Sequence, residues 1–73
     1  MDQDKQKSLQ VAFEKNVKRI RQQKNLTQMQ LAVKAETDIR QIQRIEAGDI
    51  ATSITQAQLI AQSLEVGLDE LVE

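Results

Sequence analysis

The 73 residues of this chain suffice for one small domain with a modest core. The absence of cysteine and histidine excludes disulfide bridges, thiolate or imidazole metal sites and the usual general base of enzymes. The net charge of −1, taken alone, argues against a nucleic-acid partner. Residues 1–35, however, have a net charge of +5 and residues 36–73 a net charge of −6. Such a chain can present a positive face to phosphates, or merely a solvated surface with charges of both signs.

Several classes of site are missing from the sequence. It contains no glycine-rich phosphate loop and no Ser-His or Cys-His pair, so we do not expect an enzyme. We also expect no cofactor, no metal ion and no small-molecule ligand. Phe13 is the single aromatic residue, which argues against modules that stack single-stranded bases on several rings. Because no apolar run is as long as a membrane span and no signal peptide is visible, we predict a cytoplasmic protein without membrane contact.

The N-terminal residues differ from the rest of the chain. Residues 1–8 are polar and are predicted to form a flexible tail, followed by one domain over residues 9–73. The two lysines of the tail, Lys5 and Lys7, either form a basic arm that contacts phosphates or belong to a plain disordered segment. The domain contains no proline and is rich in Gln, Lys, Glu, Leu and Ala, which predicts an all-α fold.

Five helices are predicted in chain order. Apolar residues with helical spacing predict the first from Leu9 to about Lys24, with Asn25 as a left-handed cap. Ser/Thr/Asp-x-x-Gln patterns predict the capping boxes of the next three helices, namely Thr27 with Gln30, Asp38 with Gln41, and Ser53 with Gln56. The second helix is expected to reach about Ala35 and the third to end at Gly48. A last helical turn, over residues 68–72, follows Gly67.

The apolar positions of these helices define the expected core. The stripe of the fourth helix is Ala57, Ile60, Ala61 and Leu64. The predicted core comprises Phe13, Val17, Ile20, Leu26, Leu31, Ala32, Ala35, Ile42, Ile45, Ile54, Ile60, Ala61, Leu64, Val66, Leu68 and Leu71.

Residues 26–48 predict two short helices joined by a tight turn, a layout that fits a helix-turn-helix. From Phe13 to Leu71, about four-fifths of the chain, the sequence resembles the Cro/repressor-type (lambda-repressor-like, XRE) helix-turn-helix family. The matching elements are Arg21, Leu26-Thr27-Gln28, Leu31-Ala32, Ile42, Ile45-Glu46, Gly48, Ser53-Ile54, Ile60-Ala61, Leu64, Val66 and Leu68-Asp69-Glu70-Leu71. The resemblance implies a compact five-helix domain whose third helix enters the DNA major groove.

The resemblance also assigns residues to the contacts with double-stranded DNA. Base edges would be read by exposed residues of the third helix, which are Ile39, Arg40, Gln43 and Arg44. The alternative for both arginines is phosphate contact or solvation. Phosphate would be bound at the start of the second helix by Lys24, Thr27 and Gln28, because a helix N-terminus attracts anions. Gln28 could also be an ordinary polar residue, and Gln41 is interpreted as a cap partner only.

Arg21 and Glu46 resemble a pair that forms a structural salt bridge in many relatives, tying the first helix to the end of the third.

Four positions depart from the family pattern. Glu36 and Glu65 stand where glycine usually adopts a left-handed conformation, and Thr37 replaces an aliphatic residue beneath the turn. Asp49 lies in a loop that lacks the basic residues many relatives aim at phosphates, which puts strong DNA affinity in doubt.

Two apolar residues, Ile50 and Leu59, are expected to be exposed. In the family this region often carries a dimer contact, although single exposed apolar residues are also normal. The leading hypothesis is therefore a sequence-specific transcriptional regulator that reads an operator as a homodimer. A protein-interaction module of the same fold, such as an antitoxin with a protein partner, is the alternative. A restriction-modification controller protein is a variant of the first hypothesis, distinguished by cooperative binding to tandem sites.

Overall fold

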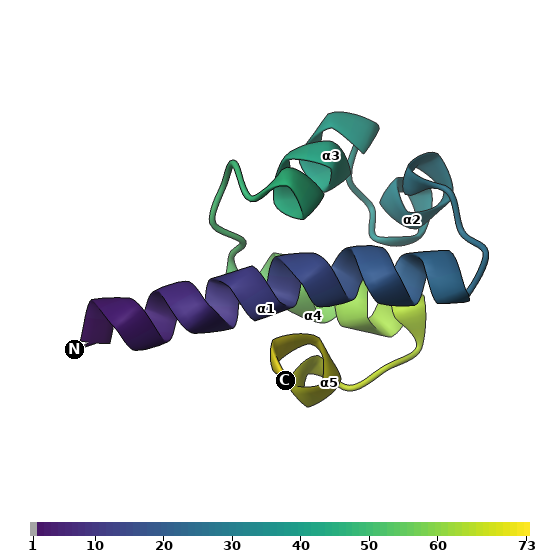
Figure 1. Cartoon of the computed structure of the whole chain (residues 1–73). Helices are drawn as coiled ribbons and strands as arrows, with labels where there is room; N and C mark the ends of the chain where they lie inside the picture. Colours follow the sequence, from purple (N-terminus) through teal and green to yellow (C-terminus); the bar gives the residue numbers. More distant parts are fainter. Residues whose placement is uncertain (1) are drawn as a thin grey trace.

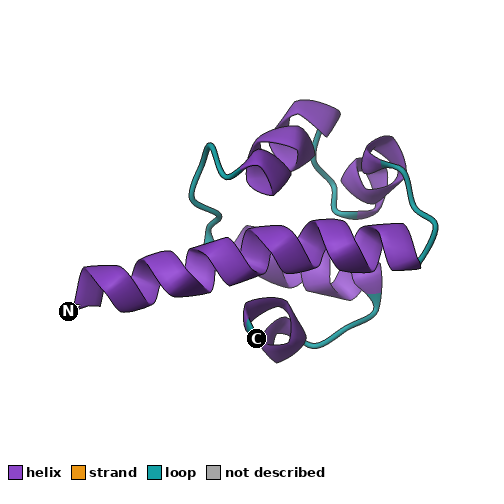
Figure 2. Ribbon diagram, in the orientation of Figure 1, coloured by secondary structure: helices purple, strands orange, loops and turns teal. Residues whose placement is uncertain are grey.

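The computed structural model describes the backbone of residues 2–73 and the side chains of residues 9–73. It contains five helices, α1 (Asp2–Gln23), α2 (Gln28–Lys34), α3 (Ile39–Ala47), α4 (Ile54–Leu64) and α5 (Leu68–Val72). Figure 2 shows helices and connecting loops, and the described part of the chain contains no strand. The predicted all-α class is therefore confirmed.

Helix α1 is the long element around which the others are arranged (Figure 1). It packs against α3, α4 and α5, whereas α2 packs against α3 and α4. In the view of Figure 1, α2 and α3 lie on one side of α1 and α5 lies on the opposite side. The pair formed by α2 and α3 is thus carried on one face of the domain by α1 and α4. No helix among the described residues is long and apolar enough to cross a membrane.

The structure differs from the sequence prediction at the N-terminus. Helix α1 begins at Asp2 and not at Leu9, so the backbone of residues 2–8 is helical. Acidic residues at the start of a helix favour its dipole, and the segment contains neither glycine nor proline to stop the helix. Met1 and the side chains of Lys5 and Lys7 lie outside the described residues. The flexibility of this tail stays a prediction.

The N-terminal caps of three helices lie where the sequence predicted them. Thr27 and Gln30 form a reciprocal capping box on α2, with the Gln30 amide donating to Thr27 Oγ1 at 3.0 Å and the Thr27 amide donating to Gln30 Oε1 at 2.8 Å. Asp38 caps α3 and Ser53 caps α4. In these two helices the glutamine at the box position does not return to the cap, so the prediction of a reciprocal box was wrong there.

Among the described residues, four turns have a residue with positive φ, and three of these residues are not glycine. Asn25, Glu36 and Glu65 have φ values of 58°, 58° and 59°. Gly48, with φ 78°, ends α3. A Cβ atom there would lie 2.7 Å from Glu14 Oε2, the end of a flexible side chain that can move aside, so the requirement for glycine comes from the backbone conformation. The turns at Glu36 and Glu65 therefore keep the left-handed conformation although glutamate replaces the usual glycine, and both glutamates are strained.

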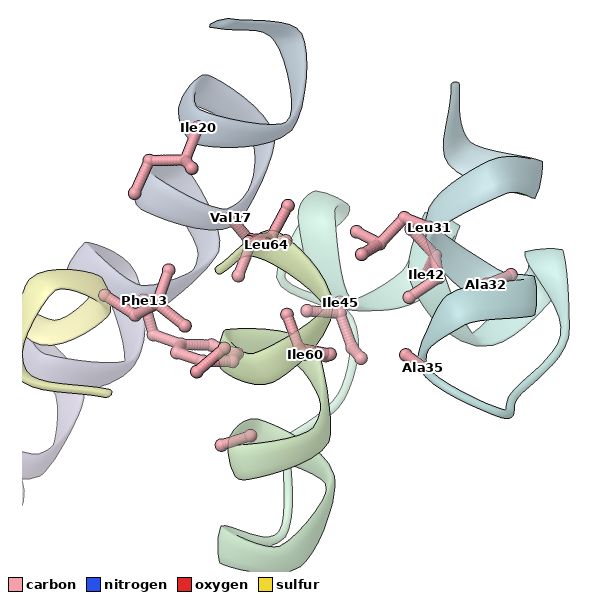
Figure 3. Close-up of a cluster of buried hydrophobic side chains, with 13 residues drawn as sticks. Phe13, Val17, Ile20, Leu31, Ala32, Ala35, Ile42, Ile45, Ile60 and Leu64 are labelled. Atoms are coloured by element: carbon pink, nitrogen blue, oxygen red, sulfur yellow. The ribbon is translucent and has the colours of Figure 1, made fainter. Parts of the chain in front are cut away.

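The core lies between α1, α4 and the helix pair α2–α3 (Figure 3). Its buried apolar residues are Phe13, Val17, Ile20, Leu31, Ala32, Ala35, Ile42, Ile45, Ala57, Ile60, Ala61, Leu64 and Leu71. Three predicted core residues, Leu26, Val66 and Leu68, are only partly buried and pack against this cluster. Ile54 was wrongly assigned to the core, because it is 66% exposed at the first turn of α4, beyond the buried stripe.

Glu65→Gly should raise the free energy of unfolding by about 1 kcal/mol, because glycine adopts the left-handed conformation without a Cβ clash. Glu65→Ala is the matched control, since it removes the same charge but keeps a Cβ, and it should give no stabilisation. Chemical denaturation followed by circular dichroism measures both. Equal stabilisation by alanine and glycine would attribute the effect to charge and contradict the strain argument.

Candidate nucleic-acid interface

Helices α2 and α3 and the turn between them form a helix-turn-helix unit. Its inner face is apolar, since Leu31 and Ala32 of α2 and Ile42 and Ile45 of α3 are all buried. The turn passes through the left-handed residue Glu36, and the next amide donates to the Ala32 carbonyl at 2.9 Å. Local hydrogen bonds and the buried face together fix how α3 leaves α2.

The outward face of α3 is polar and basic. Arg40, Gln43 and Arg44 are exposed and Ile39 is half-buried. Arg40 and Arg44 lie opposite Ile42, because residues four apart share one face of a helix, and Gln43 adjoins them. Ile39 is three residues before Ile42 and therefore lies nearer the buried face. Neither arginine makes an ion pair with another described residue. The face therefore offers guanidinium forks and one amide as hydrogen-bonding groups for an external partner.

At the start of α2 the residues predicted to bind phosphate have different surroundings. Lys24 and Thr27 are exposed, and the Thr27 hydroxyl is already used as the helix cap. Gln28 is half-buried and its Nε2 donates to Glu46 Oε1 at 3.1 Å. A side-chain amide has a second N–H, so Gln28 retains a donor besides its backbone amide. The Lys24 ammonium and these donors are what this end of α2 can offer an anion.

Arg21 and Glu46 form a nearly buried ion pair, with side chains 10% and 4% exposed. Arg21 donates from Nε to Glu46 Oε2 at 2.7 Å and from Nη2 to Glu46 Oε1 at 3.1 Å. Its Nη1 donates to the Leu26 carbonyl at 2.8 Å. This single guanidinium therefore joins the end of α1, the loop before α2 and the last turn of α3.

A second polar cluster joins the first turn of α3 to α4. Gln41 Nε2 donates to Gln56 Oε1 at 2.9 Å, and Gln56 Nε2 donates to Thr37 Oγ1 at 3.4 Å. The interpretation of Gln41 as a cap partner only was therefore wrong. Sequence reasoning missed the contact because the spacing of both glutamines also fits a capping box, and nothing in the sequence pairs residues of two different helices.

The surface predicted to carry a dimer contact is less exposed than expected. Ile50 and Leu59 are both half-buried, and Ile50 packs against the core. The exposed apolar side chains nearby are Leu9 and Ile54, which are 52% and 66% exposed. Both line a groove of about 280 Å³ between α1, α4, α5 and the loop after α3. Its other lining residues are Gln10, Phe13, Ala51, Thr52, Ala57, Leu68 and Val72.

The buried α2–α3 pair, its left-handed turn and the exposed polar row of α3 define a helix-turn-helix protein. A family model described as Helix-turn-helix matches residues 17–71, which is more than half of the chain, and the chain belongs to this family. The family resemblance noted in the sequence is thereby confirmed.

Among solved structures, the chain is similar to the restriction-modification controller protein C.AhdI from Aeromonas hydrophila. The two are 26% identical over 85% of this chain and 94% of that chain, with a TM-score of 0.81. No curated protein matches the chain significantly. Family membership and the structural likeness support a DNA-binding regulator as the class of this protein.

Glu46→Leu should lower the free energy of unfolding by about 3 kcal/mol, because it leaves the buried Arg21 guanidinium without its carboxylate. The double variant Arg21→Met/Glu46→Leu should lose less than Glu46→Leu alone. Arg19→Met, at an exposed position of the same helix, should cost about 0.5 kcal/mol or less. Denaturant titration of these three variants and of Arg21→Met measures the coupling, and a double variant as costly as the sum of the two single changes would contradict a coupled buried pair.

Proposed function

We propose that the protein is a sequence-specific regulator that binds double-stranded DNA with α3 in the major groove. The observation that carries this proposal is the exposed row of Arg40, Gln43 and Arg44 on the face of α3 opposite its buried isoleucines. Arginine can contact guanine with two parallel hydrogen bonds, and glutamine can do the same with adenine. Half-buried Ile39, at the start of the helix, suits contact with a thymine methyl group.

Phosphate contacts would set the register of α3 on the duplex. Thr27 and Gln28 begin α2, Lys24 belongs to the turn before them, and a helix N-terminus favours an anion. Such contacts position a protein without carrying sequence information. Asp49, exposed just after α3, would repel phosphate, so we expect modest affinity and a shallow dependence on salt.

The first test is selection from a pool of randomised duplexes, followed by affinity measurements at two salt concentrations. The proposal expects enrichment of a palindrome whose half-sites lie about one helical turn, ~34 Å, apart. Enrichment of two such palindromes in tandem, bound cooperatively, would favour the controller variant, which the likeness to C.AhdI supports. Weak binding without any enriched sequence would contradict the proposal.

Arg44→Ala should reduce affinity for the enriched duplex by about 1–3 kcal/mol and relax the preference at one base pair, if this arginine reads guanine. Arg40→Ala should do the same at a neighbouring position. Repeating the selection with each variant measures the preference. A loss of equal size on every duplex would assign that arginine to phosphate instead. Lys34→Ala, exposed on α2, is the matched loss of one positive charge.

We further propose a homodimer, with a second copy of this chain seated on the groove beside α1 and α4. In a twofold dimer the same patch meets itself, so Ile54 of each copy can enter the groove of the other. Ile54 is exposed and lines the groove with Phe13, Ala57 and Leu68, which suits this exchange. The half-buried side chains of Ile50 and Leu59 offer less surface to a partner.

Ile54→Glu should convert the dimer to a monomer in sedimentation experiments, since it places a charge where the apolar contact would form. The first turn of a helix tolerates an acidic residue, so the fold should persist. Leu59→Glu is the comparison and should leave the dimer intact. If Leu59→Glu gives a monomer and Ile54→Glu stays a dimer, the dimer contact lies instead on the surface of Ile50 and Leu59 that the sequence predicted.

A protein-interaction function is the second candidate. The observation that favours it lies on α2, where Met29 and Val33 are 52% and 68% exposed on neighbouring turns. An antitoxin of this fold would use such a surface, or the acidic second half of the chain, against a partner protein. Failure of the DNA selection together with retention of one specific protein in a pull-down would support this candidate.

A further inference from the structure

Gln56 contacts both sides of the point where α3 begins. Its Oε1 accepts from Gln41 Nε2 at 2.9 Å, and its own Nε2 lies 3.4 Å from Thr37 Oγ1. Thr37 precedes the cap of α3 and Gln41 belongs to its first turn. All three side chains are half-buried, so water competes less for these hydrogen bonds than on an open surface.

The contact is not part of helix capping. Asp38 Oδ1 accepts from the Gln41 amide at 2.8 Å, and Ser53 Oγ accepts from the Gln56 amide at 3.1 Å. In both caps the glutamine donates from its backbone amide, so its side chain stays available for another contact. In α2 the equivalent Gln30 turns back to its own cap. Gln41 and Gln56 instead reach across to each other, which joins two helices.

The position of the contact matters because of what the first turn of α3 carries. Ile39 and Arg40 belong to the same turn as Gln41 and are two of the residues assigned to base edges. The far end of α3 is held by the ion pair of Glu46. Buried isoleucines hold the helix against the core, but apolar contacts have no direction and tolerate small rotations. Base reading requires side chains placed to within about 0.5 Å.

We propose that Gln56 is a positioning residue that sets DNA sequence preference by fixing the rotation of the first turn of α3 through Gln41. The inference rests on the proposed function. Thr37 replaces the aliphatic residue that is usual beneath the turn, and Gln56 of α4 is its hydrogen-bond partner. Gln56 itself does not touch DNA in this account.

Gln56→Leu tests the proposal by removing both hydrogen bonds while keeping side-chain bulk. We expect a roughly 3- to 10-fold loss of affinity for the duplex enriched by the wild-type chain, the effect of about one hydrogen bond. Binding to unrelated duplex should stay within about twofold, because phosphate contacts are unchanged. Repeated selection should show relaxed preference at the base pairs beneath Ile39 and Arg40. The base pairs beneath Gln43 and Arg44 should keep theirs.

Two further variants separate positioning from folding. Gln56→Glu keeps an acceptor for Gln41 and should restore most of the preference. Gln58→Leu makes the same change at an exposed position of α4 and should alter neither affinity nor preference. Gln41→Ala should reproduce the effect of Gln56→Leu, and the double variant Gln41→Ala/Gln56→Leu should be no worse than either alone.

The outcomes are distinguishable. A wild-type chain that enriches no sequence overturns the proposed function and this inference with it. A wild-type chain that enriches a sequence, with Gln56→Leu retaining the same preference at every base pair, overturns only the inference. The inference is also overturned if Gln56→Leu loses helical signal in circular dichroism while Gln56→Glu stays folded but binds with relaxed preference. In that case an acceptor for Gln41 does not restore the sequence preference.

Discussion

The ion pair between Arg21 and Glu46 is the interaction on which the placement of α3 depends. It brings the end of α1, the loop before α2 and the last turn of α3 to one guanidinium. Gln28 adds a further donor to the same carboxylate. Apolar burial holds these helices together, and the forked, nearly buried pair adds a directional contact. Because both partners are desolvated, neither can be lost without leaving a buried charge behind.

The two ends of α3 are held by different chemistry. Its last turn is held by the ion pair, and its first turn by the glutamines of α3 and α4. Between them, Ile42 and Ile45 are fully buried, so the outward row of arginines is presented on a helix fixed at both ends. The turns at Glu36 and Glu65 hold glutamates in the left-handed conformation, which lowers the stability of a small domain.

Local patterns in the sequence predicted much of this structure. The starts of α2, α3 and α4 follow from Thr27, Asp38 and Ser53, because a cap is a contact between neighbours in sequence. The ion pair was inferred from family resemblance and not from spacing. The pairing of Gln41 with Gln56 and the exposure of Ile54 could not be predicted, because both depend on how distant helices pack. The roles of Arg40 and Arg44 toward DNA stay predictions.

The central claim is that α3 is the surface that meets DNA, and amide chemical-shift mapping tests it most directly. The ¹⁵N-labelled chain would be titrated with the duplex it enriches, and a shuffled duplex would serve as the control. The largest shifts are expected in residues 39–44 and at the start of α2, and the shifts in residues 39–44 should be weaker on the shuffled duplex. Shifts confined to the groove beside Leu9 and Ile54, or shifts of equal size on both duplexes, would contradict it.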